Sequence, residues 1–261
     1  MDRKLLFFDV DGTIVTARHF IPPSAAEALR RALEGGHVLM INTGRTLRHV
    51  EPQVRALPVS GFICSLGGHI FLNGRELCYY TLDRDECCRI RDLGYSCGMD
   101  MLFESEEAVW YDRRCVNPHG EREFGWLTSI GVPGYRDTGL DNFQFDKFVC
   151  WPREGGDRER FRHEIADRYD MIDREHNMME VVQKGLSKAW GMRLVMERLG
   201  ICMEDVYAFG DGPNDLPMLQ AAGHSALLGN APKSLWSEAE YVAKPIDQNG
   251  LWDAMAHFGL I

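Results

Sequence analysis

Short, wholly apolar runs recur along the first part of the chain. They cover residues 5–8, 38–41 and 62–64, and each has the length of a strand rather than a helix. A strand that is apolar at every position is typical of a sheet covered on both faces. Strands of this kind that alternate with helices predict a parallel sheet with right-handed crossovers.

A helix is expected between the first two of these strands. Pro22 and Pro23 interrupt the chain, and Ser24 is predicted as the N-cap, with Glu27 completing a capping box three residues later. The paired glycines at 35–36 are predicted to end the helix.

The last third of the chain repeats the alternation. Helices are predicted over residues 188–199, in a short segment that ends near 223, and near 232–237. Strands are predicted over residues 206–209, 225–228 and 241–243.

The middle of the chain has a different pattern. Between residues 83 and 182 the periodicity loosens, with candidate strands at 108–111, 144–150 and 178–182. This stretch holds 14 Lys and Arg against 23 Asp and Glu, so it carries nearly all of the net charge of −10. The sequence therefore predicts an α/β protein: a Rossmann-like parallel-sheet core formed by residues 1–82 and 184–261, and an inserted α+β domain formed by residues 83–183.

The charge and the apolar runs also narrow the class of partner. A net charge of −10 opposes nucleic-acid binding, which usually needs a basic surface. No apolar run approaches the ~20 residues of a membrane span, so we expect a cytoplasmic protein with no nucleic-acid or membrane partner.

Two carboxylates follow the first predicted strand. Asp9 and Asp11 are one residue apart, and Gly12 allows a sharp turn directly after them. The carboxyl end of a parallel strand is where such sheets bind ligands, and clustered carboxylates there favour a hard cation such as Mg²⁺. An ordinary Asp-Gly turn explains the same residues equally well when they are taken alone.

Polar groups with a different chemistry follow the second strand and the insert. Thr43 and Gly44 offer a hydroxyl and backbone N–H groups to an anion, and Arg45 comes next. Ser187 is predicted as an N-cap, which places Lys188 in the first helical turn, where a cation opposes the helix dipole unless an anion lies nearby.

A second acidic cluster follows the strand at 206–209. Asp211, Asn214 and Asp215 lie in the sequence Gly-Asp-Gly-Pro-Asn-Asp. Four polar motifs in this order, each next to an element of the predicted core, are expected to converge on one edge of the sheet.

These four motifs resemble those of the haloacid dehalogenase (HAD) superfamily, and the insert, the Gly-Leu-Ser-Lys phrase at 185–188 and the Gly-Asn-Ala phrase at 229–231 resemble its Cof-type phosphatases with a large α/β cap. Two departures stand out: Ala189 follows Lys188 where relatives carry Gly, and residues 65–68 differ from their usual Asn-Gly-Ala phrase.

The resemblance implies a Mg²⁺-dependent phosphomonoester hydrolase. Asp9 would be the nucleophile that forms an aspartyl phosphate, and Asp11 the general acid and base. The metal site would use Asp9, Asp11, Asp211 and Asp215. The phosphate would be bound by Gly12, Thr43, Gly44, Arg45, Lys188 and Asn214, with Thr43 and Lys188 also counted as catalytic.

The predicted substrate is a small phosphorylated metabolite, in particular a sugar or polyol phosphate, and the predicted state is a monomer or weak homodimer. Two alternatives stay open at this point. A phosphosugar mutase uses the same fold and aspartyl phosphate, and a non-catalytic protein can retain the fold to sense a phosphorylated ligand. Arg113, Arg114 and Lys147 are the candidate cap residues for contact with the leaving group.

Overall fold

The computed structural model describes residues 3–261. The chain forms two units, of which the first contains residues 3–44, 52–78 and 187–261 and the second contains residues 45–51 and 79–186. The sequence placed the boundaries at 82/83 and 183/184, a few residues from these positions, and did not predict that residues 45–51 group with the second unit.

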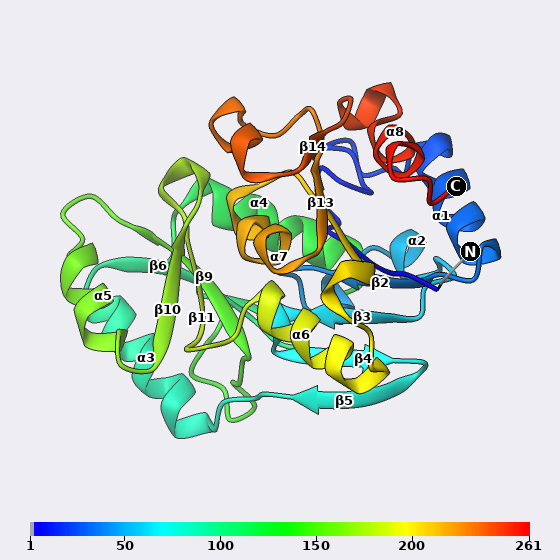
Figure 1. The fold of residues 1–261 in the computed structure, drawn as a ribbon. Coiled ribbons are helices and arrows are strands. Elements are labelled where there is room, and N and C mark those ends of the chain that lie inside the picture. Colours follow the sequence, from blue (N-terminus) through cyan, green and yellow to red (C-terminus); the bar gives the residue numbers. More distant parts are fainter. Residues whose placement is uncertain (1–2) are drawn as a thin grey trace. The chain divides into compact units, whose positions relative to one another are not determined.

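An eight-stranded sheet forms the centre of the first unit (Figure 1). The strands from β14 to β3 are parallel, and β4 runs antiparallel to β3. In spatial order they are β14 (Tyr241–Val242), β13 (His224–Leu227), β12 (Val206–Gly210), β1 (Leu5–Phe8), β2 (Val38–Asn42), β3 (Gly61–Cys64), β4 (His69–Leu72) and β5 (Arg75–Tyr79).

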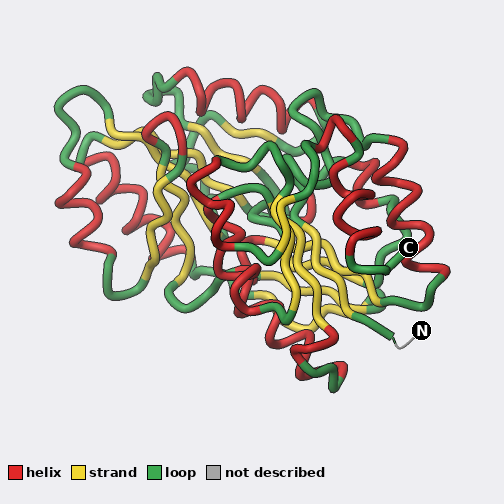
Figure 2. The backbone as a smooth tube through the Cα atoms, turned by 45° about the horizontal axis from the view of Figure 1, so that its top comes forward, coloured by secondary structure: helices red, strands yellow, loops and turns green. Residues whose placement is uncertain are grey.

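Helices cover both faces of this sheet, as the tube in Figure 2 shows. On one side α1 (Pro23–Glu34) packs against β2 and against α8 (Gly250–His257). On the other side α6 (Lys188–Leu199) and α7 (Leu216–Ala221) share an apolar core with the strands. The short helix α2 (Pro52–Arg55) lies between β2 and β3 in the sequence. Burial on both faces explains why β1 and β2 are apolar at nearly every position.

The second unit is built on a six-stranded sheet. Its order is β10 (Tyr169–Asp173), β11 (Met179–Gln183), β9 (Lys147–Pro152), β6 (Met99–Glu104), β7 (Val109–Tyr111) and β8 (Gly134–Tyr135). The pairs are antiparallel except β7 with β8. One apolar cluster joins the sheet to α3 (Arg84–Ser96) and α5 (Arg158–Ile165), and a second joins it to α4 (Pro118–Ser129).

The predicted fold class, a parallel α/β core with an inserted α+β domain, is confirmed. One detail was wrong: Ser24 is not the N-cap of α1, because Pro23 already occupies its first turn and Pro22 takes the cap position without a side-chain hydrogen bond. The apolar patterns also missed α2, β4 to β6, β8, β10 and α8. No helix in residues 3–261 is long and apolar enough to cross a membrane.

Candidate active site

Four polar side chains from three segments of the first unit meet at one edge of its sheet. Asp9 directly follows β1, and its backbone N–H donates to the carbonyl of Phe209 in β12 at 2.9 Å. Asp211 directly follows β12, and Asp215 lies one turn further on. Because β1 and β12 are parallel neighbours, their carboxyl ends bring these carboxylates together, as the sequence predicted for this edge.

Lys188 links two of these carboxylates. Its ammonium group donates to Asp9 Oδ1 and, at 2.6 Å, to Asp215 Oδ1, and its exposure is 1%. Ser187 caps α6 by accepting from the N–H of Trp190 at 3.1 Å, as predicted, so the cation stands in the first helical turn. The two carboxylates offset the unfavourable helix dipole and the desolvation of the ammonium group.

Asn42 holds the same helix start from the neighbouring strand. Its side-chain N–H donates to the carbonyl of Lys188 at 3.1 Å, and both residues are buried. This contact, which sequence reasoning missed, joins the end of β2 to the start of α6. Its signal in the sequence is an asparagine that ends an otherwise apolar strand.

Asp215 positions its neighbours through its second oxygen. Oδ2 accepts from the backbone N–H groups of Asp211 at 2.9 Å and Gly212 at 3.0 Å, and the residue is fully buried. Gly210 is required beside it, because a Cβ there would lie 2.6 Å from the Asp215 side chain. Both oxygens of Asp215 thus already accept hydrogen bonds, and its predicted place in the metal site stays a prediction.

The donor set fits a divalent cation. Carboxylate oxygens of Asp9, Asp211 and Asp215 lie within 4.8 Å of one another, with one lysine to balance three negative charges. Burial, and then repulsion from Asp215, raises the pKa of Asp9 above its ordinary value despite Lys188. Burial, and then repulsion from Asp9, raises the pKa of Asp211 in the same way. A hard divalent cation with oxygen ligands relieves this repulsion, so the residues fit Mg²⁺.

The remaining predicted residues of the first unit lie in segments that follow the parallel strands β1, β2 and β12. Thr43 follows β2, is buried, and donates its backbone N–H to Ile63 at 2.8 Å. Asp11 is exposed in the turn after β1, and Asn214 is half-buried in the 3₁₀ turn that carries Asp215. Their roles stay predictions, as does the role of Gly44.

Arg45 belongs to the second unit. Its guanidinium lies 4.4 Å over the ring of Trp126, 3.3 Å from Glu51, and donates to the carbonyl of His49 at 3.2 Å. Its predicted contact with phosphate stays a prediction.

Lys147, a candidate for contact with the leaving group, is instead enclosed by its own unit. Its ammonium group lies 2.8 Å from Glu180 and 3.4 Å from Glu104, and Glu104 also lies 2.8 Å from Nδ1 of His49. All four side chains are buried. The ammonium group of Lys147 is therefore paired with two carboxylates of its own unit. We refer to His49, Glu104, Lys147 and Glu180 as the buried cluster of the second unit.

The other two candidates differ from Lys147. Arg113 is exposed, and Arg114 forms an ion pair with Asp112 at 2.8 Å and lies 4.3 Å over the ring of Tyr95. The Arg114 side chain is exposed although its partner Asp112 is buried, and the role predicted for both arginines stays a prediction.

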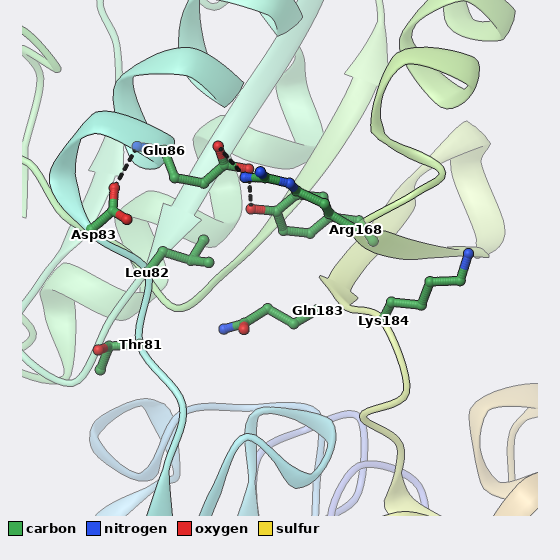
Figure 3. A pocket seen from close by; sticks show the side chains of 8 residues that line it. Thr81, Leu82, Asp83, Glu86, Arg168, Gln183 and Lys184 are labelled. Atoms are coloured by element: carbon green, nitrogen blue, oxygen red, sulfur yellow. Dashed lines mark hydrogen bonds and ion pairs between the residues drawn. The ribbon is translucent and has the colours of Figure 1, made fainter.

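A pocket of about 340 Å³ opens elsewhere in the second unit (Figure 3). Its charged groups are already engaged: Asp83 caps α3 through the N–H of Glu86, and Glu86 contacts Arg168 and Tyr169. The pocket has no cluster of nucleophilic or metal-binding groups. It is lined by Thr81, Leu82, Asp83, Glu86, Arg168, Tyr169, Gln183 and Lys184.

Comparisons with known proteins agree with the chemistry of this edge. Residues 6–255 match the family model described as haloacid dehalogenase-like hydrolase. The chain is 30% identical over 263 residues to "Putative phosphatase YkrA" of Bacillus subtilis, with both chains covered completely. It is 26% identical to HMP-PP phosphatase of Serratia proteamaculans, over 90% of this chain and 86% of that one. Among solved structures, the HAD subclass IIB sugar phosphatase BT4131 superposes with a TM-score of 0.83 at 27% identity, over 99% of this chain and 100% of the other.

Proposed function

Because the chain belongs to the haloacid dehalogenase-like hydrolases, we propose that it is a Mg²⁺-dependent phosphatase that acts through a phosphorylated Asp9. The observation that carries the proposal is the buried contact of Lys188 with Asp9, beside Asp211, at the carboxyl edge of the sheet. A carboxylate held next to a fixed cation is placed to approach a phosphoryl group, whose own negative charge would otherwise repel it.

The first half of the reaction transfers the phosphoryl group to the protein. A carboxylate oxygen of Asp9 forms a bond to phosphorus while the ester P–O bond breaks. Asp11, protonated, gives its proton to the departing oxygen, so the product leaves as an alcohol. Lys188 supplies positive charge to the phosphoryl oxygens, and Thr43 and Gly44 supply a hydroxyl and a backbone N–H.

The second half returns the site to its starting state. Asp11, now a carboxylate, takes a proton from a water molecule, whose oxygen bonds to phosphorus as the bond to Asp9 breaks. Inorganic phosphate leaves, and Asp9 is again a carboxylate. When bound, Mg²⁺ supplies positive charge that offsets the repulsion between these carboxylates and the phosphate; Asp9, Asp211 and the backbone carbonyl of Asp11 would hold it, with Asp215 behind them.

We infer that the substrate is a small phosphorylated metabolite and, more narrowly, a sugar or polyol phosphate. One relative named above is an HMP-PP phosphatase, and the 27% identical BT4131 is named a sugar phosphatase. The acidic second unit supports a substrate with few phosphate groups, since a polyphosphate would be repelled by it. A cytoplasmic location and a monomeric or weakly dimeric state stay predictions.

The test is phosphate release from a panel of sugar phosphates, nucleotides and p-nitrophenyl phosphate, with Mg²⁺ and with EDTA. We expect release that requires Mg²⁺ and is abolished in Asp9→Asn, while the matched variant Asp247→Asn, at an exposed position of the same unit, keeps it. Mass spectrometry of acid-quenched protein should show one added phosphate that Asp9→Asn lacks. Folded protein that releases no phosphate from any compound would overturn the proposal; transfer to a second sugar position instead of water would identify a mutase.

A further inference from the structure

The side chain of Asn230 joins three separate segments of the first unit. Its Nδ2 donates to Asp211 Oδ2 at 2.8 Å and to the carbonyl of Gly12 at 3.0 Å. Its Oδ1 accepts from the backbone N–H of Ile246 at 3.0 Å. These partners lie after β12, after β1 and after β14, so one exposed amide ties the acidic segments to the last loop of the sheet.

The chemistry of the three partners determines the orientation of the amide. The backbone N–H of Ile246 is only a donor, so it must face the oxygen of Asn230. The Asp211 carboxylate and the Gly12 carbonyl are acceptors, so both must face the NH₂ group. An aspartate or a serine at position 230 cannot satisfy the same set.

Gly12 also lies against the same carboxylate oxygen. Gly12 has φ +82°, and a Cβ on it would lie 1.9 Å from Asp211 Oδ2, the oxygen that Asn230 binds. The backbone N–H of Asp211 is meanwhile bound to Asp215. Asp211 is therefore held by three neighbours, and Asn230 is the one that acts on its carboxylate through a side-chain donor.

We propose that Asn230 is a positioning residue that orients Asp211 and the Gly12 turn for Mg²⁺ binding; this rests on the proposed function. Partners that orient a metal-binding carboxylate contribute to affinity because they remove the cost of fixing the carboxylate when the ion binds. Loss of Asn230 frees the carboxylate of Asp211 and the turn that carries Asp11 at once. Asn230 itself needs no contact with the substrate for this role.

Isothermal titration of the full chain with Mg²⁺, without substrate, tests the role directly. We expect Asn230→Ala to weaken Mg²⁺ binding by roughly 10- to 100-fold. Asn230→Ser is too short to reach Asp211 and should show the same loss, so a failure of Asn230→Ala to fold does not remove the test. The matched control is Gln220→Ala, since Gln220 is an exposed amide of the same unit that donates to Glu238 at 3.1 Å.

Three further readouts separate positioning from a structural role and from the proposed function. At a temperature at which Asn230→Ala and Gln220→Ala are both fully folded, circular dichroism in EDTA should show the same folded fraction, and Asn230→Ala should still bind added Mg²⁺ more weakly than Gln220→Ala. In hydrolysis, the Mg²⁺ concentration for half-maximal rate should rise, while the substrate KM at saturating Mg²⁺ is unchanged. Wild-type affinity in both Asn230 variants, or no Mg²⁺ binding by the wild type, would overturn the inference. Wild-type protein that binds Mg²⁺ but hydrolyses nothing would contradict the proposed function and leave the titration valid as a test of positioning.

Discussion

The ammonium group of Lys188 lies 2.6 Å from the carboxylate of Asp215, and the exposure of both residues is 1% or less. The same ammonium group contacts Asp9, so a single cation stabilises two buried carboxylates. Burial lowers the pKa of Lys188, but Asp215 and Asp9 raise it further, and the net shift is upward. The lysine is therefore charged at neutral pH.

Replacing Lys188 with methionine should damage both stability and activity. It leaves Asp9 and Asp215 buried without their cation, which costs about 3–5 kcal/mol of unfolding free energy. Under the proposed function it also lowers kcat by about 10²–10³, the usual loss when a fixed charge that stabilises the transition state is removed. Urea unfolding and phosphate release measure the two effects.

The control for this variant is Lys184→Met. Lys184 is exposed and donates to a backbone carbonyl, of Ala166, at 2.8 Å. The Lys184→Met variant should change neither the unfolding free energy nor kcat measurably. If Lys188→Met matched Lys184→Met in both experiments, the role assigned to the buried cation would be wrong.

Gly12→Ala and Gly36→Ala separate backbone strain from steric displacement of Asp211. Both glycines have a positive φ, +82° and +84°, so alanine is strained at either position by about 1 kcal/mol. A Cβ at Gly36 meets nothing within 4 Å, whereas one at Gly12 would lie 1.9 Å from Asp211 Oδ2. Gly36→Ala should lose stability alone.

Gly12→Ala should in addition lose activity by about 10²-fold or more, since small displacements of reacting groups have effects of that size. Comparison of kcat/KM with the melting temperature for both variants checks this. Equal activity in the two variants would show that the close approach of Gly12 to Asp211 is not needed for the reaction.

The sequence predicted the first unit well because its polar site residues come directly after apolar strands in the sequence. Residues 5–8 and 206–209 are apolar runs, and the polar residues directly after them can only lie at the sheet edge. For this reason the sequence predicts that Asp9, Asp211 and Asp215 lie together at this edge. The prediction of Ser187 as an N-cap is also confirmed, because a cap depends only on residues within one helical turn.

Features that depend on distant partners were not predictable. Strand β6 contains Asp100 and Glu104, which break its apolar pattern, and both are buried only because partners far along the chain neutralise them. Arg153 pairs with Asp100 at 2.5 Å, and His49 contacts Glu104 across 55 positions of sequence. The grouping of residues 45–51 with the second unit has the same origin.

Lys147→Met tests the buried cluster of His49, Glu104, Lys147 and Glu180. Removal of the lysine leaves two buried carboxylates facing each other, and we expect a loss of about 3–5 kcal/mol in urea unfolding at pH 7. The triple variant with Glu104→Gln and Glu180→Gln leaves neither of these carboxylates buried without the lysine and should lose less than Lys147→Met alone, although Arg174 loses its contact with Glu180. Arg113→Met, at an exposed position, is the control. If Lys147→Met were as stable as Arg113→Met, the conclusion that Lys147 stabilises the two buried carboxylates would be wrong.

Glu104 should make the stability of the second unit depend on pH. Burial raises its pKa, but Lys147 and the hydrogen bond with His49 lower it further, and the net pKa is about 2 against an ordinary 4.5. Because the folded pKa is the lower one, the carboxylate stabilises the fold at pH values above 4.5, and this stabilisation is lost as the pH falls towards 2.

The shift corresponds to about 3 kcal/mol at neutral pH. Glu104→Gln lacks this contribution at every pH, so the difference in unfolding free energy between wild type and variant should narrow by about 1 kcal/mol between pH ~5.5 and ~3.5. Urea unfolding at a series of pH values measures it, with Glu154→Gln, at an exposed turn, as the matched control that stays parallel to the wild type. A difference that stays constant over this range would show that Glu104 titrates alike in the folded and unfolded chains, and the ion-pair account of the cluster would then fail.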